Sequence, residues 1–366
     1  MKFSCLKEKL EKALAAAERF TGKNTNLPIL GNVLLEVNNN ALQITATNLE
    51  YAVQISLPGK MTEQGKISVP AKIISSLVQS IKEEKVDLEE KGGNLLIKTE
   101  TRDTRINGIP AGDFPITPKI KKSHTFLIDA AALQSGLEKI LPSVSLSEFK
   151  PELTGVFFNI QTGTLKLAAT DTFRLAEKSM ELLKKSEGAN FSFILPHRVS
   201  QEISRTLGIG GDEASVSFGD NQMLFESGNI KIISRVIEGN FPDYSGIIPK
   251  KFDVSGFLDR DDLLNSVKSA SIFSSKIQDV TLNFHPKNLE VLSNNPEIGE
   301  NKISIPVSST GKDVKISFNY RYLLDGLNVL DNDEIFIGCN SEANPSLIRN
   351  KTDDSFLYVL MPIRSV

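Results

Sequence analysis

Disulfide frameworks and metal centres need residues that this sequence holds in small number. It contains two cysteines, Cys5 and Cys339, among 366 residues. Two cysteines are too few for a disulfide framework, so we expect a protein of the reducing cytoplasm. The three histidines, His124, His197 and His285, are far apart and lack the spacing of metal ligands. The sequence therefore predicts neither a metal site nor a cofactor.

Membrane spans and secretion signals are also missing. No apolar run approaches the length of about 20 residues that a membrane helix needs. The first ten residues include Lys2, Lys7, Glu8 and Lys9, which makes them too charged for a secretory signal. We therefore expect no membrane partner. A three-domain adhesin or carbohydrate-binding protein stays an alternative, but a secretion signal would have favoured it.

A strong net charge of one sign is absent as well. The net charge is −3, and residues 1–122, 123–250 and 251–366 carry balances of +4, −3 and −4. No third of the chain is strongly basic, so the overall charge does not identify a nucleic-acid-binding protein. Such a role would depend on a local basic face.

The sequence contains no complete catalytic motif. The segment from Gly59 to Ile67 resembles a phosphate-binding loop, but it has one residue too many between its glycines and lacks the Ser or Thr that holds magnesium. Asp261 and Asp262 fall in the first turn of a predicted helix, where acidic side chains complement the helix dipole. We therefore predict a protein without catalytic residues. The alternative, a DNA-metabolising enzyme, would need a cluster of metal-binding carboxylates.

A repeat is what the sequence does contain. The segment Gly163-Thr-Leu-Lys-Leu-Ala-Ala-Thr-Asp-Thr-Phe-Arg-Leu175 has two relatives, at residues 40–50 and 287–297. Each copy has a leucine, a polar residue and an aliphatic residue, followed by a polar turn. The copies are about a third of the chain apart, which indicates repeated domains and not a short-period solenoid. We predict three domains, residues 1–122, 123–250 and 251–366, with linkers at 119–123 and 249–252.

Each third has the same predicted plan of helix, strands, second helix and strands. The first helices are predicted over residues 5–20, after Asp129 and after Asp259, where the aspartates are candidate caps. The second helices are predicted at Ala71–Ile81, His197–Leu207 and Tyr320–Leu330, and β-branched strands at 33–37, 156–160 and 280–284. Short connections favour antiparallel sheets. The fold class is therefore α+β, with two helices packed on antiparallel sheets in each of three repeated domains.

Basic residues gather on the predicted helices. Lys12 and Arg19 lie near one face of the first helix, and Arg198 and Arg205 are two turns apart on a later one. One interpretation is that these are ordinary solvated faces. The other is that helices repeated on one side of three sheets form a common surface for DNA phosphates, without reading bases.

Five segments give the chain a resemblance to a known family. They are Leu27-Pro-Ile-Leu-Gly-Asn32, Ala111-Gly-Asp-Phe-Pro115, Ala168-Ala-Thr-Asp-Thr-Phe-Arg-Leu-Ala176, Gly239-Asn-Phe-Pro-Asp-Tyr244 and Tyr358-Val-Leu-Met-Pro-Ile-Arg364. In order and spacing, the whole chain resembles the bacterial sliding clamps, the β subunits of DNA polymerase III.

The resemblance implies a non-catalytic processivity factor for DNA replication. It implies a head-to-tail homodimer whose six domains close a ring around double-stranded DNA, bound without sequence preference, with helices lining the hole. It also implies partners that carry clamp-binding peptides: the DNA polymerase III catalytic subunit, the clamp loader, and other polymerases and repair proteins.

The resemblance also implies three sets of site residues. A partner-peptide pocket between the second and third domains would be lined by Leu153, Thr170, Thr172, Phe173, Arg174, Leu175, Pro242, Ile247, Tyr322, Val359, Met361, Pro362, Ile363 and Arg364. The DNA-facing residues would be Lys12, Arg19, Lys23, Lys72, Lys82, Lys139, Lys150, His197, Arg198, Arg205 and Lys268. The dimer interface would include Ile106, Ile272 and Phe273.

The sequence departs from the family pattern in the predicted pocket. Thr172-Phe173 stands where many members have Gly-His, and Ser245-Gly246 where a basic pair is common. We expect these changes to alter peptide preference. The apolar run Val359–Ile363 near the chain's end is expected to be held as a strand, with pairing that stops near Pro362 because proline has no N–H to donate.

Overall fold

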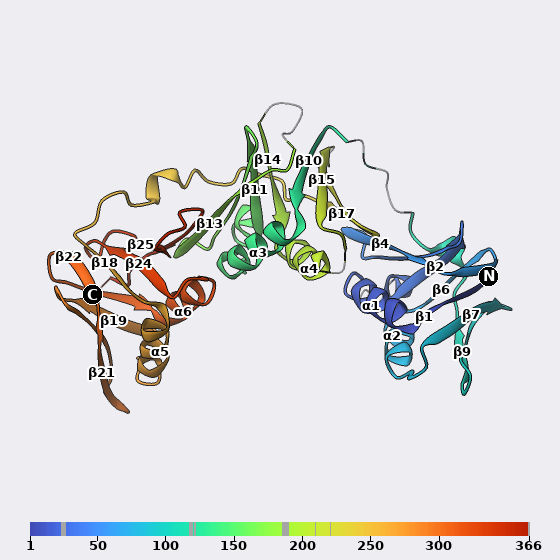
Figure 1. The fold of residues 1–366 in the computed structure, drawn as a ribbon, viewed down its shortest axis with the longest axis horizontal. Coiled ribbons are helices and arrows are strands. Elements are labelled where there is room, and N and C mark those ends of the chain that lie inside the picture. The colour runs from blue at the N-terminus through green and yellow to red at the C-terminus, as the bar shows by residue number, and fades with distance from the viewer. Residues whose placement is uncertain are drawn as a thin grey trace. The chain divides into compact units, whose positions relative to one another are not determined.

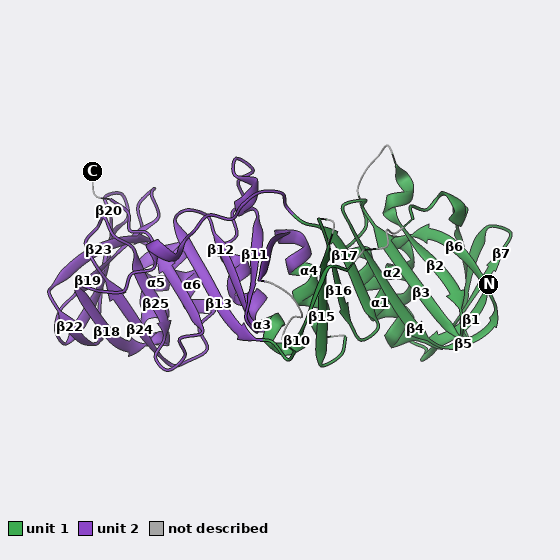
Figure 2. Cartoon of the chain, turned by 90° about the horizontal axis from the view of Figure 1, so that it is seen from above, with its two compact units in different colours: residues 1–134, 182–189, 201–236 green, residues 135–181, 190–200, 237–366 purple. Residues whose placement is uncertain are grey.

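The computed structural model describes residues 1–22, 27–116, 120, 122–184, 190–208, 210–219 and 221–364. The chain divides into two compact units, shown in different colours in Figure 2. Unit 1 holds residues 1–134, 182–189 and 201–236, and unit 2 holds residues 135–181, 190–200 and 237–366. The central third of the sequence is thus divided between the units.

Unit 1 is built on two antiparallel sheets, whose elements can be followed in Figure 1. The smaller has the order β5-β1-β7-β8-β9, with strands Lys60–Glu63, Lys2–Leu6, Lys85–Lys91, Asn94–Lys98 and Asp103–Asn107. The larger has the order β10-β15-β16-β17-β4-β3-β2-β6, with strands His124–Asp129, Glu213–Gly219, Gln222–Ser227, Ile230–Arg235, Tyr51–Pro58, Ala41–Thr47, Asn32–Asn38 and Gly65–Pro70. The helices α1 (Lys7–Glu18) and α2 (Ala71–Gln79) contact each other.

Unit 2 repeats this plan with its own two sheets. The larger has the order β14-β11-β12-β13-β26-β25-β24-β18-β22, with strands Phe191–Pro196, Gly155–Gln161, Thr164–Thr170, Arg174–Glu181, Phe356–Leu360, Ser346–Asn350, Glu334–Cys339, Val254–Asp259 and Ser308–Gly311. The smaller has the order β21-β20-β19-β23, with strands Gly299–Pro306, Asn288–Asn295, Asp279–Phe284 and Val314–Asn319. The helices α5 (Arg260–Ser271) and α6 (Tyr320–Asn328) contact each other.

The predicted helices form, and two of the predicted caps are made. Helices α3 (Ala130–Ile140) and α4 (His197–Leu207) each contribute residues to both units. Asp129 Oδ1 accepts a hydrogen bond of 2.8 Å from the Ala132 N–H, and Asp259 Oδ1 accepts one of 2.8 Å from Asp262. These bonds satisfy N–H groups that a helix start otherwise leaves unpaired. The α+β class with antiparallel sheets is confirmed.

The prediction that each third opens with a helix is wrong. A short strand comes first each time: β1 before α1, β10 before α3 and β18 before α5. In β1, Phe3 and Cys5 are buried and alternate with more exposed residues. Two buried positions are too short a pattern to separate a strand from the start of a helix. Leu6, assigned to the helix, is the last residue of the strand and is exposed.

The repeat extends to individual hydrogen bonds. After β3, Thr47 Oγ1 donates to the Tyr51 carbonyl and accepts from the Leu49 N–H. After β12, Thr170 Oγ1 donates to the Arg174 carbonyl and accepts from the Thr172 N–H. Leu49 and Thr172 have φ values of 79° and 78°, so both turns use the same left-handed residue.

A second repeated bond fixes the end of each third. The N–H groups of Ile109, Ile237 and Ile363 donate to the carbonyls of Ser68, Ile194 and Ser317, each over 2.8 Å. The acceptors lie at matching positions before α2, α4 and α6. As predicted, the run near the chain's end is a strand, β26, and its pairing stops at Leu360, before the proline.

Neither thiol takes part in a disulfide. Cys5 on β1 and Cys339 on β24 are free and buried. None of the described helices has the length and apolarity that crossing a bilayer would require. Within the described ranges, no group of His, Cys, Asp and Glu side chains is arranged to hold a metal ion.

Candidate functional site

The hairpin turn between β12 and β13 presents the predicted pocket residues. Asp171 Oδ1 accepts hydrogen bonds of 3.0 Å from the N–H groups of both Phe173 and Arg174. Together with the Thr170 hydroxyl, this carboxylate forms hydrogen bonds with the backbone groups of the turn. The Phe173 side chain is therefore left on the surface, where it is 57% exposed.

Arg174 connects this turn to helix α6. Its Nε donates to Asp171 Oδ2 over 3.0 Å, and its Nη1 donates to Asp325 on α6. Its guanidinium also lies over the Tyr322 ring, 4.4 Å from the centroid, and the Phe173 ring stacks on the same tyrosine at 6.3 Å. A guanidinium bound by two carboxylates and an aromatic face has little freedom, so the turn and the helix are fixed together.

The last described residues run past this turn. The Met361 N–H donates to the Phe173 carbonyl over 2.8 Å, and the Ile363 N–H donates to Ser317 over 2.8 Å. Met361, Pro362 and Ile363 are half-buried. The two backbone bonds hold an apolar segment at the surface, where a chain end without such bonds would be expected to fray.

Beside the turn lies an apolar cluster covered by residues 236–253, the segment between β17 and β18. Leu175, Leu347 and Val359 form a buried cluster, since β13 pairs with β26 and β26 with β25. Five partly buried side chains pack against it: Tyr244, Ile248, Phe252, Phe336 and Leu357. Tyr244 and Ile248 come from this segment, which therefore covers two of the predicted pocket residues, Leu175 and Val359.

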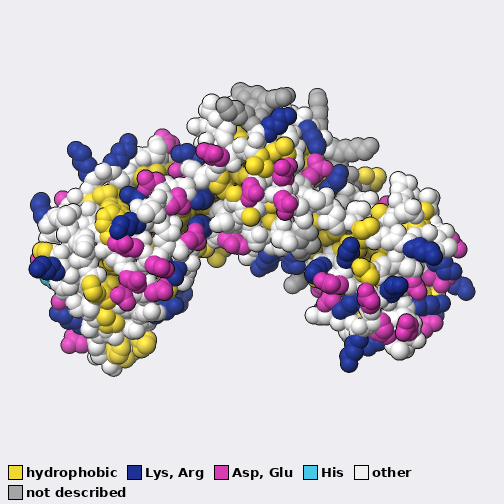
Figure 3. Space-filling view, in the orientation of Figure 1, with side chains coloured by type: hydrophobic (Ala, Val, Ile, Leu, Met, Phe, Trp, Pro, Cys, Tyr) yellow, Lys and Arg dark blue, Asp and Glu magenta, His cyan; other side chains and the backbone are white. Residues whose placement is uncertain are grey.

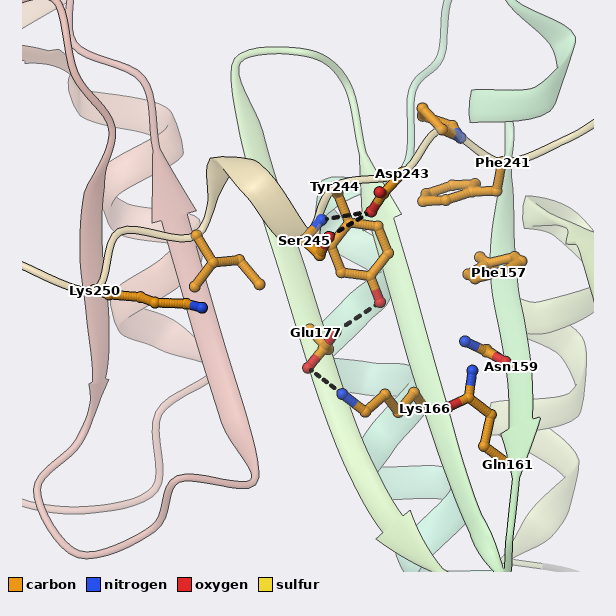
Figure 4. A pocket seen from close by; sticks show the side chains of 12 residues that line it. Phe157, Asn159, Gln161, Lys166, Glu177, Phe241, Asp243, Tyr244, Ser245 and Lys250 are labelled. Atoms are coloured by element: carbon orange, nitrogen blue, oxygen red, sulfur yellow. Dashed lines mark hydrogen bonds and ion pairs between the residues drawn. The ribbon is translucent and has the colours of Figure 1, made fainter.

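A pocket of about 500 Å³ opens next to this cluster (Figure 4). Two of its lining side chains contact Glu177. The Tyr244 hydroxyl donates to Glu177 Oε2 over 2.6 Å, and Lys166 Nζ lies 3.4 Å from Glu177 Oε1. Burial, with the nearby Glu177 carboxylate, raises the pKa of Tyr244 far above its usual value. The phenol therefore stays protonated and remains a donor. The parallel rings of Phe157 and Phe241 stack at 4.7 Å along one side.

The structure brings together part of the predicted pocket. Described contacts join Thr170, Thr172, Phe173, Arg174, Tyr322 and Met361 in one group, and Leu175 and Val359 in another. Pro242 lines the pocket of Figure 4. Ile247 and Arg364 are exposed, and Leu153 is buried in the short 3-10 helix Pro151–Leu153, where its carbonyl accepts from Ser145. For these three, no described contact reaches the turn or the cluster.

Sequence reasoning named Pro242 and Ile247 from the segment between β17 and β18 and Tyr322 from α6, but it missed Tyr244 and Asp325 of the same two segments. Tyr244 belongs to the quoted segment Gly239–Tyr244 but was not assigned to the site, although it contacts both the cluster and Glu177. Asp325, which accepts from Arg174, carried no signal in the sequence because 151 residues separate the pair. No pattern in the sequence singled out Lys166 or Glu177, although Glu177 is buried.

The predicted DNA-facing cations differ in how free they are. Lys72, Lys82, Lys150 and Lys268 are exposed. Four others are in ion pairs: Lys12 with Glu8, Arg19 and Arg205 with Glu202, and Lys139 with Asp331. Arg198 is exposed, and Lys23 lies outside the described residues. In Figure 3, lysine and arginine side chains lie among acidic ones over the visible face.

Two of these residues do not present a positive charge as expected. Lys139 is only 5% exposed, and its ammonium pairs with Asp331 and lies 5.6 Å from the Phe356 ring centroid. The positive charge of Lys139 is therefore paired within unit 2. His197 has its pKa lowered by burial, so its ring is neutral at neutral pH. Sequence spacing placed both on helices but could not show their burial.

The three predicted interface residues occupy strand and helix ends. Ile106 is buried on β9, an edge strand of the smaller sheet of unit 1. In unit 2, Ile272 follows α5 and is 67% exposed, and Phe273 is half-buried. A methyl group added to Gly299, the first residue of the edge strand β21, would lie 3.7 Å from the Phe273 ring.

Three family models match consecutive parts of the chain. They describe the N-terminal, central and C-terminal domains of the DNA polymerase III beta subunit, and they match residues 1–118, 127–243 and 245–364. Curated relatives named beta sliding clamp include one from Synechococcus elongatus, 29% identical over 100% of this chain and 99% of its own length, and one from Staphylococcus epidermidis, 27% identical over 93% of each.

Solved structures agree with this match. A sliding clamp from Pseudomonas aeruginosa bound to griselimycin is 27% identical, with a TM-score of 0.95 over 100% of both chains. The DNA polymerase III beta subunit from Thermotoga maritima is 25% identical, with a TM-score of 0.93 over 100% of both chains.

Proposed function

Because the chain belongs to the family of DNA polymerase III beta subunits, the sliding clamps, we propose that it is the processivity factor of its cell's replicative polymerase. In this role it encircles duplex DNA in the cytoplasm and tethers the DNA polymerase III catalytic subunit. The clamp loader and other polymerases and repair proteins would use the same peptide groove. It catalyses no reaction of its own.

The arrangement of sheet edges supports ring closure by two copies. Within unit 1, β4 pairs with β17, and within unit 2, β13 pairs with β26. By the repeat, β21 is the counterpart of β4 and β13, and β9 is the counterpart of β17 and β26. Both are edge strands of their sheets, β21 in the C-terminal third and β9 in the N-terminal third. Head-to-tail pairing of β9 with the partner's β21 would cover these two edges.

The repeat also supports a register for this contact. Ser234 pairs with Tyr51 and Leu360 pairs with Arg174, and the counterparts of these pairs are Ile106 and Gly299. Ile106 would therefore meet Gly299 of the second copy, next to Phe273. Changing Ile272 and Phe273 together to aspartate should yield monomers in sedimentation, while circular dichroism stays that of the folded chain. A dimer that persists would contradict this interface.

The state of the basic residues supports loose contact with DNA. Several predicted contacts are already paired with a neighbouring carboxylate, and Lys72, Lys82, Lys150 and Lys268 are exposed. Contacts of this kind give weak, salt-dependent binding without base preference. A ring that holds DNA topologically needs nothing stronger, and tight phosphate contacts would slow its sliding.

The decisive experiment separates topological retention from affinity. The protein is loaded on a closed circular duplex by a clamp loader, and gel filtration then measures how much stays with the DNA at 0.5 M salt. We expect retention on the closed circle and release within minutes after a restriction enzyme cuts it. Retention that does not depend on circularity would overturn the ring mechanism.

The peptide groove has its own test at the chain's end. Deleting Pro362–Val366 removes the Ile363 bond to Ser317 but leaves the Met361 bond to Phe173. We expect a loss of about 1 kcal/mol of stability, the usual contribution of one hydrogen bond, and an unchanged dimer. Binding of polymerase-derived peptides in calorimetry should be lost. Unchanged affinity would remove the groove from this surface.

A further inference from the structure

The contact proposed between β9 and the second copy's β21 has a register that decides which side chains face each other; Figure 1 labels both strands. The repeat places Ile106 opposite Gly299, in line with the pairing of β4 with β17 and of β13 with β26. In an antiparallel pair, each step forward on one strand is a step back on the other. Two pairs of charged side chains then lie opposite each other: Arg105 with Glu300, and Asp103 with Lys302.

Both pairs join opposite charges. Directly opposite side chains of an antiparallel pair point to the same side of the sheet, with Cβ atoms about 5 Å apart. Asp103 and Arg105 are exposed on β9, and Glu300 and Lys302 are exposed on β21. An acid and a base on one strand therefore face a base and an acid on the other, in the order that attraction requires.

Most of these charged groups are available to a second copy. Asp103, Arg105 and Glu300 make no ion pair or side-chain hydrogen bond with any residue that the structure describes. Lys302 differs, since its Nζ lies 2.7 Å from Glu290 Oε1 on the neighbouring strand β20. An ammonium group has three N–H donors, so Lys302 can bind Glu290 and a second carboxylate together. Arg105 and Glu300 are the pair that is available on both strands.

The two pairings inside the chain hold uncharged residues at the place of the first of these pairs. There Ile233 lies opposite Ala52, and Val359 lies opposite Leu175. Val359 and Leu175 belong to the buried cluster covered by residues 236–253. At neither of the two places do two charges face each other within the chain. The connections of one chain already direct its own strand pairings, whereas a pairing between two copies has to select its partner and register by itself, and complementary charge supplies that selection.

The alternation of charge also disfavours other registers. If β21 slipped by two residues in one direction, Arg105 would face Lys302. In the other direction, Asp103 would face Glu300. Like charges directly opposite each other destabilise a strand pair. A slip of one residue would turn the buried side of one strand toward the exposed side of the other. The register set by the repeat is therefore the one that the charges favour.

We propose that Arg105 with Glu300, and Asp103 with Lys302, form ion pairs between two copies of this chain and select the register of their contact. The inference rests on the proposed function, because it assumes that β9 and β21 meet head to tail. Exposed ion pairs each add little affinity, so the main effect of these four residues is on the choice of partner and register.

The test reverses one charge at a time in the full-length protein. Arg105→Glu puts two acids opposite each other at both contacts of a ring, and Glu300→Arg puts two bases there. Each variant should raise the dimer dissociation constant about 10- to 30-fold in sedimentation equilibrium, and the effect should shrink from 0.05 to 0.5 M salt. Lys91→Glu is the control, since this lysine is exposed on β7, an inner strand of the same sheet, and the charge change is equal.

Mixing the two variants is the decisive step. In a head-to-tail dimer with one chain of each kind, the new acid of one chain faces the new base of the other at one contact. At the second contact, native Arg105 faces native Glu300. The mixture should therefore form dimers as tightly as the native protein, with one chain of each kind in native mass spectrometry. Combining Arg105→Glu and Glu300→Arg in a single chain should restore the dimer as well.

The outcomes separate this inference from the proposed function. If neither single change weakens the dimer, or if mixing restores nothing, the ion pairs are wrong, and the head-to-tail contact stands as long as changing Ile272 and Phe273 to aspartate gives monomers. If Arg105→Glu weakens the dimer and Glu300→Arg does not, two β9 strands pair with each other and both proposals are wrong. A native protein that is monomeric would overturn both as well.

Discussion

The seam between β4 and β17 in unit 1 and the seam between β13 and β26 in unit 2 have the same backbone but different interiors. Both are antiparallel, and the repeat matches them residue by residue. In the second seam, Lys139 pairs with Asp331 and lies near the ring of Phe356. In the first seam, these three positions are held by Ala16, Gly208 and Ile230.

The smaller side chains leave space in the first seam. A cavity of about 590 Å³ there is lined by Ala16, Gly208 and Ile230, with Lys9 and Lys12 also on its lining. The comparison teaches that a strand pairing can be kept while the space beside it is filled or left open, because the ladder of backbone bonds does not depend on the side chains next to it.

The turns beside the two seams differ in the same manner. Arg174 in the second turn bonds to Asp171 and Asp325 and lies over Tyr322. Its counterpart in the first turn is Tyr51, which packs edge-on against Phe20 at 5.7 Å. The second turn thus carries a charged network that reaches the surface, in keeping with the peptide groove proposed there, and the first turn carries an aromatic contact.

The largest difference should appear on truncating these two counterparts. Arg174→Ala should weaken binding of a polymerase-derived peptide about 30-fold, the effect of losing an interface residue worth about 2 kcal/mol. Tyr51→Ala should leave that affinity unchanged while costing about 3 kcal/mol of stability, because it removes a buried ring. Calorimetry and urea unfolding measure the two effects. Equal losses of affinity would show that the seams are not functionally distinct.

In the second seam, Lys139 fills the space beside the paired strands, and a smaller residue should leave that space open. Lys139→Ala should destabilise the protein by about 2 kcal/mol, mainly because it opens a cavity at a buried position near the Phe356 ring. Lys139→Met keeps the volume and should cost less than about 1 kcal/mol, because Asp331 is exposed enough to be hydrated. The two variants are compared by urea denaturation. If methionine cost as much as alanine, the ion pair and not the volume would hold this seam.

In the first seam, the space beside the paired strands can be filled by introducing the same lysine and aspartate at the matching positions. Ala16→Lys alone should destabilise by about 1 to 2 kcal/mol, because it places an ammonium at a position that is 1% exposed. Adding Gly208→Asp should recover about 1 kcal/mol of that loss. A double-mutant cycle measures the coupling, and additive effects would mean that the two seams are not equivalent in geometry.

The smallest effect is expected from Gly208→Ala. An added methyl group would have its nearest neighbour at 3.9 Å, and the residue does not have a left-handed φ. The substitution should therefore stabilise the protein by up to about 0.5 kcal/mol by restricting the unfolded chain. A thermal melt suffices, and a loss of stability would indicate that the cavity lining is less open than its geometry implies.

The sequence predicted what the repeat imposes. The helices after Asp129 and Asp259, the antiparallel sheets and the end of β26 before Pro362 follow from periodicity, capping and the chemistry of proline. The repeat also marked the turn at Thr170 as one unit with the turn at Thr47. These features depend on residues close in sequence.

The remaining features depend on residues far apart in sequence. The resemblance placed Lys139 among the DNA-facing residues, and its pairing with Asp331, which spans 192 residues, left no local pattern in the sequence. Tyr244 lies between β17 and β18 in a segment without periodicity, so no sequence pattern indicated its packing against the cluster of Leu175 or its bond to Glu177. A mismatch between repeats, alanine in one and lysine in the other, is the kind of signal that points to such positions.

The burial of both native thiols makes the chain suited to site-specific labelling. Desolvation raises the pKa of Cys5 and of Cys339 to about 12. At pH 7 almost no reactive thiolate is present at either position, and reagents reach neither side chain easily. A cysteine introduced on an exposed position such as Lys72 or Lys251 can therefore take a maleimide dye without replacing the native residues. Distances between dyes on two copies could then follow opening and closing in real time.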